Sequence, residues 1–506
     1  MADEIRIDPG RYGIDHNKKL VIVNQAIDWL NQNTPQKDAI FIDDKHYTIE
    51  NPINNLQVGI PYSIKDTDQN RYTLYFTELP LIHIATENTI VDEPKVAATF
   101  TIAESTADII TSDIGIEYRG GTSQLLPKKS FKIGFWQDNT GTTKKDVQLL
   151  GMRSDNKWDL QAMAIQPLKV RSKTNFDIWR KINSLHYQSS EPEAVNSSRW
   201  EYAELFLNGE YRGVYGVSEP VDRKQLKLKK TNEETGMRGE LYKGNGWGAT
   251  IFSSCPPYDN NSLLWVNNNG SGFEWQYPDE IDYFIFINSI IAVDNTGHNL
   301  FIAKYNANEP YFYVPWDLDS TVGLDFDGSL LAPDKLHVSK DLLKNNMYRR
   351  LLLDNSAAGF QAKLKTKWLQ LRNDWLTVPN IMNLYLENYN YLLRNGVYER
   401  EMMAWDNYHF DPQHLEYMTN YLTDRIHFLD QEFASQSSDI STIGKPKDYT
   451  NVDVSIYNIT GQLLKMMHFD EISNESLSPS LALQSGIYIL KIQNIQRKET
   501  RKIIIP

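Results

Sequence analysis

Four aspartates lie within VPWDLDSTVGLDFDG, the fifteen residues from Val314 to Gly328. The apolar run before them predicts a buried strand that ends near Trp316, because Asp and Ser follow. Asp317 and Asp319 are two residues apart, so their side chains face the same way if the chain stays extended. Neighbouring carboxylates repel each other unless a cation or a basic side chain lies between them. The spacing alone is typical of a solvated loop, but a second polar segment before this strand favours a metal site.

A second polar segment, VDNTGHN, lies between an apolar helix pattern and an apolar strand pattern. Within it, Asp294 and Asn299 are separated by four residues, and Asp317 follows eighteen residues after Asn299. Protein-kinase-like phosphoryl transfer uses the same order: an Asp that orients or deprotonates the acceptor, then an Asn and an Asp that hold Mg²⁺. The alternative is that Asp294 and Asn295 simply terminate a helix.

Such chemistry also needs basic groups, and EYRGGTSQLLPKKSFKIGFW offers them. Arg119 opens a Gly-Gly-Thr-Ser turn whose backbone N–H groups are suited to phosphates. Lys128, Lys129 and Lys132 follow, and Lys129 and Lys132 point to opposite faces of the predicted strand. Either of these two lysines is positioned to reach a nucleotide phosphate. Exposed lysines that protect an edge strand are the alternative.

Two other interpretations of the acidic segment fit less well. An EF-hand loop starting at Asp317 would need Gly where Val322 stands and a bidentate Glu where Gly328 stands. A glycosidase is supported by the 12% aromatic content, but its two carboxylates need a defined separation that the sequence does not give.

Composition limits the partners. The chain has 506 residues, of which 41% are hydrophobic, and its net charge of -13 argues against nucleic acid and anionic membranes as partners. Cys255 is the single cysteine in the sequence, so no intrachain disulfide is expected. No apolar run is long enough for a membrane span, and the N-terminus lacks the pattern of a signal peptide. Either the protein is cytosolic or a leader has been removed.

The chain is predicted to be α+β, with a β-rich half before a helical half that starts after Glu280. A helical stretch is predicted over 157–183, and Asn208-Gly209 predicts a hairpin turn between two strands. The predicted parts are a module of unknown role at 1–71, a main domain at 72–435, a polar linker at 436–449 and a small all-β domain at 450–506.

The segments RGGTSQLLPKKSFKIGF, LLGMRSDNKWDLQAM, ELFLNGEYRGVYGVSEPVDR, VDNTGHN and YFYVPWDLDSTVG, in this order, resemble the CotH family of spore-coat protein kinases. The resemblance covers roughly Tyr72 to Phe433. It implies an atypical protein-kinase-like fold that binds ATP with Mg²⁺ or Mn²⁺ and phosphorylates a protein substrate.

The resemblance also implies roles for individual residues. Asp294 corresponds to the catalytic Asp, and Asn299 and Asp317 to metal ligands, with Asp319 as an accessory ligand. Where the family has an Asp followed several residues later by Arg-Asn, this chain has Gln166 and Arg171-Ser172. The remaining implied residues are Lys129, or alternatively Lys132, on a phosphate; Arg119, Lys128 and Arg171 at the nucleotide; and backbone groups from Glu219 to Val221 at adenine.

The C-terminal segments VSIYNITGQLLK, SGIYILKI and ETRKIIIP resemble the C-terminal sorting domain of the type IX secretion system. This resemblance implies a small β-sandwich, the secretion machinery as a partner, a secreted or cell-surface location and a removed signal peptide. The full expectation is a secreted or surface protein kinase. The alternatives are a non-catalytic surface or adhesion protein with a kinase-like fold, and a carbohydrate-active surface protein.

Overall fold

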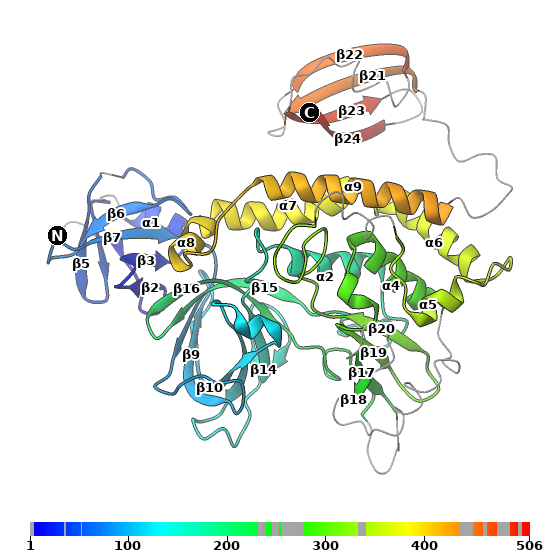
Figure 1. Ribbon diagram of the computed structural model, residues 1–506. Coiled ribbons are helices and arrows are strands. Elements are labelled where there is room, and N and C mark those ends of the chain that lie inside the picture. Colours follow the sequence, from blue (N-terminus) through cyan, green and yellow to red (C-terminus); the bar gives the residue numbers. More distant parts are fainter. Residues whose placement is uncertain are drawn as a thin grey trace. The chain divides into compact units, whose positions relative to one another are not determined.

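The computed structural model describes residues 5–34, 37–51, 53–230, 236, 238–244, 252–254, 277–331, 341–434, 449–458, 463–472, 486–493 and 498–505. The chain divides into two compact units, Met1–Ala434 and Ser435–Pro506, which are described separately (Figure 1). Cys255 and residues 436–448 of the predicted linker lie outside the described residues.

The described part of residues 5–76 forms a seven-stranded sheet, and helix α1 (Ile27–Asn33) follows β3. Its last strand in the sequence pairs with β3 and sends Tyr72, Leu74 and Phe76 into the core of this module. The module therefore extends beyond the boundary predicted at residue 71. The strands, in the order β1-β4-β5-β6-β7-β3-β2, are Ile5–Arg6, Ala39–Ile42, Lys45–Ile49, Tyr62–Lys65, Arg71–Phe76, Leu20–Val23 and Tyr12–Asp15.

Residues 81–218 contain a closed barrel whose interior is filled by alternate strand residues such as Phe100, Ile116 and Phe135. The Asn208-Gly209 turn is confirmed, since Leu207 pairs with Glu210. The strands, in the order β10-β11-β14-β16-β15-β8-β9, are Ile110–Arg119, Ser130–Trp136, Lys157–Gln161, Glu210–Ser218, Trp200–Leu207, Leu81–Ala85 and Val96–Ala103.

The helix predicted over 157–183 is correct in its second half and wrong in its first. Residues Lys157–Gln161 form strand β14, because Trp158 and Leu160 alternate into the barrel interior between β11 and β16. Helix α2 (Arg171–Ile182) begins ten residues after that strand ends.

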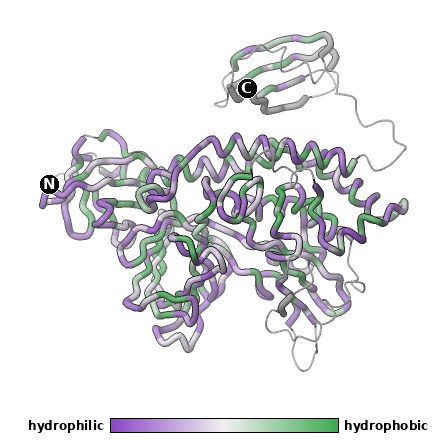
Figure 2. The backbone as a smooth tube through the Cα atoms, in the orientation of Figure 1, coloured by the Kyte–Doolittle hydropathy of each residue, from purple (hydrophilic) through white to green (hydrophobic). Residues whose placement is uncertain are grey.

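The second half of this unit is mainly helical, as predicted, so the unit is α+β with its β-rich part first. Within the described residues, α4 to α9 pack around a core that includes Trp179, Phe284 and Trp368. Figure 1 shows α7 and α9 running together, and Figure 2 shows that their residues alternate between hydrophobic and hydrophilic. The helices are α4 (Tyr277–Ile290), α5 (Asn346–Leu351), α6 (Phe360–Asp374), α7 (Val378–Arg394), α8 (Val397–Ala404) and α9 (Gln413–Ala434).

A small sheet lies against these helices, with strand order β18-β17-β19-β20. Strand β20 ends at Pro315, which confirms that the apolar strand stops near Trp316. The strands are Phe252–Ser254, Glu240–Gly244, Leu300–Lys304 and Tyr311–Pro315. None of the helices in the described residues has the length and apolarity that a membrane crossing requires.

The second unit contains β21 (Tyr449–Asn458), β22 (Leu463–Ile472), β23 (Gly486–Gln493) and β24 (Lys498–Ile505). They form a sheet in the order β22-β21-β23-β24. Its all-β character was predicted. A sandwich needs a second sheet, which is not among the described residues of this unit, so the sandwich stays a prediction.

Helix α8 places a buried carboxylate, Glu401, against the barrel. Its Oε1 accepts from Lys128 Nζ at 2.5 Å and lies 3.5 Å from Lys169 Nζ, while its Oε2 accepts from the Val214 N–H at 2.9 Å. Burial lowers the pKa of Lys169 to about 7, although Glu401 opposes that shift. Gly213 has φ +85°, and a Cβ there would overlap the Glu401 carboxylate.

The two preceding residues of α8 bind other parts of the unit. Arg400 is fully buried and donates to the Glu204 carboxylate of β15 through Nε at 3.0 Å. Glu399 accepts from the Tyr75 hydroxyl of β7 at 3.1 Å. Helix α8 therefore ties the N-terminal module, the barrel and the segment before α2 together.

We predict that Gly213→Ala destabilises the protein far more than Gly209→Ala. Both glycines have positive φ, at +85° and +77°, so both changes add backbone strain of about 1–2 kcal/mol. A Cβ at Gly209 meets nothing within 4 Å, whereas one at Gly213 displaces the Glu401 carboxylate. Urea unfolding of the two variants isolates this difference, and equal midpoints would contradict the role given to Glu401.

Candidate functional site

The β19–β20 hairpin brings two predicted metal ligands to the same end of a sheet. Leu300 pairs with Pro315, so Asn299 and Asp317 lie just beyond this pair. The Trp316 N–H donates to the Asn299 carbonyl at 3.0 Å and extends the contact between the two segments. Asn299 and Trp316 are thus neighbours at the backbone level, although they are seventeen positions apart in sequence.

Asn299 and Asp317 both have left-handed backbones, with φ of +44° and +52°. This conformation costs a non-glycine residue about 1–3 kcal/mol, and such strain concentrates at functional sites. Because Asp317 is not extended, strand alternation does not place it on the same face as Asp319, and that step of the sequence argument fails. Asp317 is exposed, whereas Asp319 is partly buried.

Three carboxylates still interact at this site. Burial and the charges of Asp317 and Asp294 raise the pKa of Asp319 to about 7. Burial, followed by Asp317, also raises the pKa of Asp294, while His298 opposes that shift. No ion pair with a Lys or Arg of the described residues neutralises any of the three carboxylates. Their charges therefore favour a bound cation.

The donor set suits Mg²⁺ or Mn²⁺ with ligands from outside the chain. Among the described residues, no three Asp, Glu, His or Cys side chains come together as a metal-binding group. Mg²⁺ is commonly held by one or two carboxylates together with substrate phosphates and water. Asp317, with the Asn299 amide, matches that sparse arrangement.

Helix α2 forms hydrogen bonds with the acidic loop, residues 317–328, through two buried side chains. Asn175 is fully buried and donates from Nδ2 to the Leu318 carbonyl at 2.9 Å and to Thr321 Oγ1 at 2.7 Å. Arg171, also fully buried, donates from Nε to the Thr321 carbonyl at 3.0 Å. This contact puts Arg171 beside the acidic loop, and its predicted role at the nucleotide stays untested.

Two buried amides were missed by the sequence reasoning. Asn175 was overlooked, and Asn295 was considered only as a helix terminator. The Asn295 Nδ2 donates to the carbonyls of Asn299 and Trp316, at 2.7 Å each. No local signal marks Asn175, because it is one of several polar residues in α2, whose sequence is RSKTNFDIWRKI.

The two departures from the family pattern are bonded to each other. Gln166 Nε2 donates to Ser172 Oγ at 2.7 Å, and Gln166 Oε1 accepts from the N–H groups of Arg171 and Ser172 at 2.9 and 3.3 Å. Gln166 thus satisfies the first N–H groups of helix α2, which have no partner within the helix.

The predicted basic residues occupy different environments. Lys128 is enclosed by its ion pair with Glu401 and its bond to the Val214 carbonyl. Lys129 Nζ donates to the Gln124 carbonyl. Lys132 is 51% exposed on the outer face of the barrel, with Nζ 3.9 Å from Glu117.

Arg119 connects the barrel to the acidic loop. Its guanidinium lies over the Trp316 ring at 5.5 Å, donates to Gln161 Oε1 and approaches the Asp159 carboxylate at 3.5 Å. Lys132 pairs across the sheet with Glu117, two residues from Arg119, so both basic side chains project from the same face of the barrel. This face contacts the residue that precedes Asp317.

The predicted adenine-contacting segment follows β16. Glu219 is fully buried, and its carboxylate accepts from Arg199 at 2.6 and 2.9 Å. Burial alone would raise the pKa of Glu219, but Arg199 and the Arg153 N–H lower it below its usual value. Its own N–H and carbonyl are bonded to Arg199 and Ser198. Val221 packs in the same cluster as Trp316.

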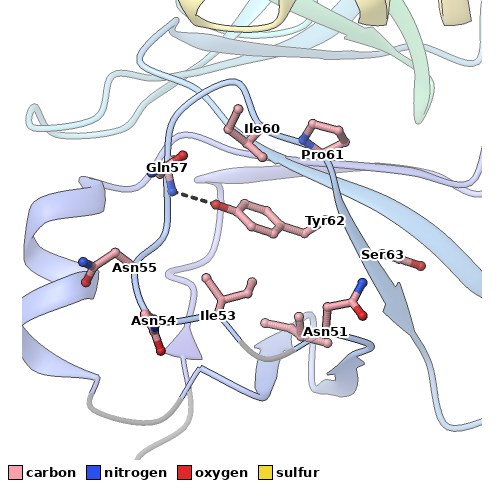
Figure 3. Close-up of a pocket in the computed structure, with 10 residues that line it drawn as sticks. Asn51, Ile53, Asn54, Asn55, Gln57, Ile60, Pro61, Tyr62 and Ser63 are labelled. Atoms are coloured by element: carbon pink, nitrogen blue, oxygen red, sulfur yellow. Dashed lines mark hydrogen bonds between the residues drawn. The ribbon is translucent and has the colours of Figure 1, made fainter.

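A cavity of about 500 Å³ lies away from these residues, in the N-terminal module (Figure 3). The Tyr62 hydroxyl accepts from the Gln57 N–H at its edge. The lining carries no charged side chain and none of the predicted site residues: Ile49, Asn51, Ile53, Asn54, Asn55, Gln57, Ile60, Pro61, Tyr62 and Ser63.

Comparison with known proteins supports two assignments along the chain. Residues 437–506 match the secretion system C-terminal sorting domain, which indicates export to the cell surface or beyond. Residues 116–280 and 276–429 match the CotH kinase protein model. These residues include the barrel strands from β11 on and the acidic loop. Inner spore coat protein H of Bacillus subtilis (strain 168) is 22% identical over 352 residues, which are 63% of this chain and 88% of that protein. Since the matched segments cover more than half of the chain, it belongs to the CotH kinase protein family.

Proposed function

We propose that this exported protein is an atypical kinase that transfers the γ-phosphate of ATP to a protein substrate with Mg²⁺ or Mn²⁺. The observation that carries the proposal is the pair of left-handed residues Asn299 and Asp317 at one hairpin end. Asp294 and Asp319 add charges that no ion pair within the described residues offsets.

Asp294 is the proposed group that orients or deprotonates the acceptor hydroxyl. Its raised pKa brings the carboxylate closer to the range in which it can accept a proton during transfer. Asn299 and Asp317 would hold the metal, with Asp319 beside them. The metal, when bound, would neutralise charge on the phosphates. The adenine contacts, made by backbone groups from Glu219 to Val221, rest on the family resemblance.

Arg119 and Lys132 are the basic residues that the geometry favours for the phosphates. Both project from the barrel face that reaches Trp316. Lys128 is less suited, because burial lowers its pKa and its ammonium is already bonded to Glu401. Lys129 would have to leave the Gln124 carbonyl before it could contact a phosphate.

The Gln166 and Ser172 departures are compatible with nucleotide binding. Their side chains form a hydrogen bond with each other, and Gln166 also accepts from the first N–H groups of α2. We therefore assign the pair to helix capping.

The first prediction concerns Asp317. Mg²⁺-ATP should raise the melting temperature, because a ligand at 100 times its Kd stabilises the native state by about 2.7 kcal/mol. Asp317→Ala should remove this shift. Asp327→Ala, which changes an exposed carboxylate of the same loop, should keep it. Absence of a shift in the unmodified protein at millimolar nucleotide would favour a non-catalytic surface protein.

The second prediction concerns Asp294. Asp294→Asn should lower phosphate transfer from radiolabelled ATP by about 10²–10⁴-fold, because the amide cannot accept the proton. Binding of Mg²⁺-ATP, measured by the same thermal shift, should persist. Transfer to the protein itself or to casein that survived this substitution would remove Asp294 from the mechanism.

The third prediction concerns Gln166. Gln166→Ala should lower the free energy of unfolding by about 1 kcal/mol, as expected for a lost helix cap. The added stabilisation by Mg²⁺-ATP should stay the same. Unchanged stability with a lost nucleotide shift would instead indicate that Gln166 contacts the nucleotide.

A further inference from the structure

Asn295 binds the backbone of Asn299 and of Trp316, the residue before Asp317, through one amide group. Its Nδ2 donates one hydrogen bond to the Asn299 carbonyl and one to the Trp316 carbonyl, each at 2.7 Å. The side chain is 1% exposed, so water does not compete for these bonds. An amide has two N–H donors on one nitrogen, which is what two converging carbonyls require.

These two carbonyls set the peptide planes that orient the ligands. The Trp316 carbonyl lies in the same rigid peptide plane as the Asp317 nitrogen, so a fixed carbonyl fixes the plane from which the φ of Asp317 is measured. The Asn299 carbonyl likewise fixes the plane that follows Asn299. Both ligands have left-handed φ values, which persist only when surrounding contacts determine them.

The position of Asn295 is itself determined by the core. Its carbonyl accepts from the Tyr283 hydroxyl of α4 at 2.8 Å, and its N–H donates to the Ala292 carbonyl at 3.1 Å. The next carbonyl, that of Thr296, accepts from Asn345 Nδ2 at 2.8 Å. Asp294 precedes Asn295 directly, so the segment that carries it is held by the same contacts.

We infer that Asn295 is a positioning residue that sets the Asn299 and Asp317 backbones for metal binding. The inference rests on the proposed function, because it assumes that these two residues hold the metal. Loss of a residue that orients metal ligands typically weakens metal affinity by about 10–100-fold. Asn295 would contribute in this way without contacting the metal.

Asn295→Asp is the sharpest test, since it keeps the shape and replaces the donating NH₂ with an oxygen that faces two carbonyls. Asn196→Asp is the matched control. Asn196 is 5% exposed, and its Nδ2 bridges two oxygens of Asn183, beyond the C-terminal end of α2, at 2.9 and 2.8 Å. Any decrease in the free energy of unfolding that comes from burying a carboxylate should appear in both variants.

The experiment measures Mn²⁺ affinity of the full chain by electron paramagnetic resonance, with a non-hydrolysable ATP analogue present. We expect Asn295→Asp to bind Mn²⁺ about 10–100-fold more weakly and Asn196→Asp to stay within about twofold of the unmodified protein. In metal-free protein, hydrogen exchange of the Trp316 amide should be faster in Asn295→Asp than in Asn196→Asp.

The outcomes separate the inference from the proposed function. Equal Mn²⁺ affinity in Asn295→Asp would overturn the inference and leave the kinase proposal standing. Absence of Mn²⁺ binding by the unmodified protein would overturn both. If Asn295→Asp does not fold, Asn295→Ala decides: a folded variant with unchanged affinity, or a second failure to fold, would overturn a positioning role.

Discussion

The buried carboxylate of Glu401 is the contact on which the arrangement of the larger unit depends. A carboxylate removed from water must be paired, and Glu401 is paired with Lys128, Lys169 and the Val214 N–H. These partners come from the end of the glycine-rich turn, the approach to α2 and a barrel strand. Helix α8 therefore holds these three segments together through one carboxylate.

Neighbouring residues of α8 extend this constraint, because successive helical side chains point about 100° apart. Glu399 reaches the N-terminal module and Arg400 reaches β15. A helix of eight residues thus contacts three different parts of the unit. The N-terminal module is consequently part of the framework that supports the candidate site, although none of the predicted site residues comes from it.

Close to the site, backbone carbonyls accept hydrogen bonds from buried amide and guanidinium side chains and not from a neighbouring strand. Left-handed residues interrupt the ladder of a strand, and the carbonyls of the residues next to them then need other partners. Asn175, Asn295 and Arg171 supply those donors. Each has more than one N–H group and so can join separate segments. The side chains of Asp317 and Asp319 take no part in these bonds.

The sequence predicted correctly the features that depend on local interactions, and it failed where the interacting residues are far apart in the chain. The Asn208-Gly209 hairpin and the end of β20 were predictable because local residues determine them. Strand β14 was predicted to be helical because its pairing partners are distant in sequence. The burial of Lys128 depends on Glu401, 273 residues away, and no local pattern indicates it. No sequence pattern indicates the hydrogen bond between Gln166 and Ser172 either.

The left-handed backbone of Asp317 has an evolutionary consequence. Glycine adopts this conformation without penalty, so replacement of Asp317 by glycine would relieve strain while deleting the carboxylate. Most substitutions destabilise a protein, but glycine at position 317 would lower backbone strain while it removed the proposed metal ligand. Under the proposed function, a family member with glycine in place of Asp317 would lose a metal ligand at no cost in backbone strain. The residue at position 317 is accordingly the first one to inspect when active and inactive relatives are distinguished.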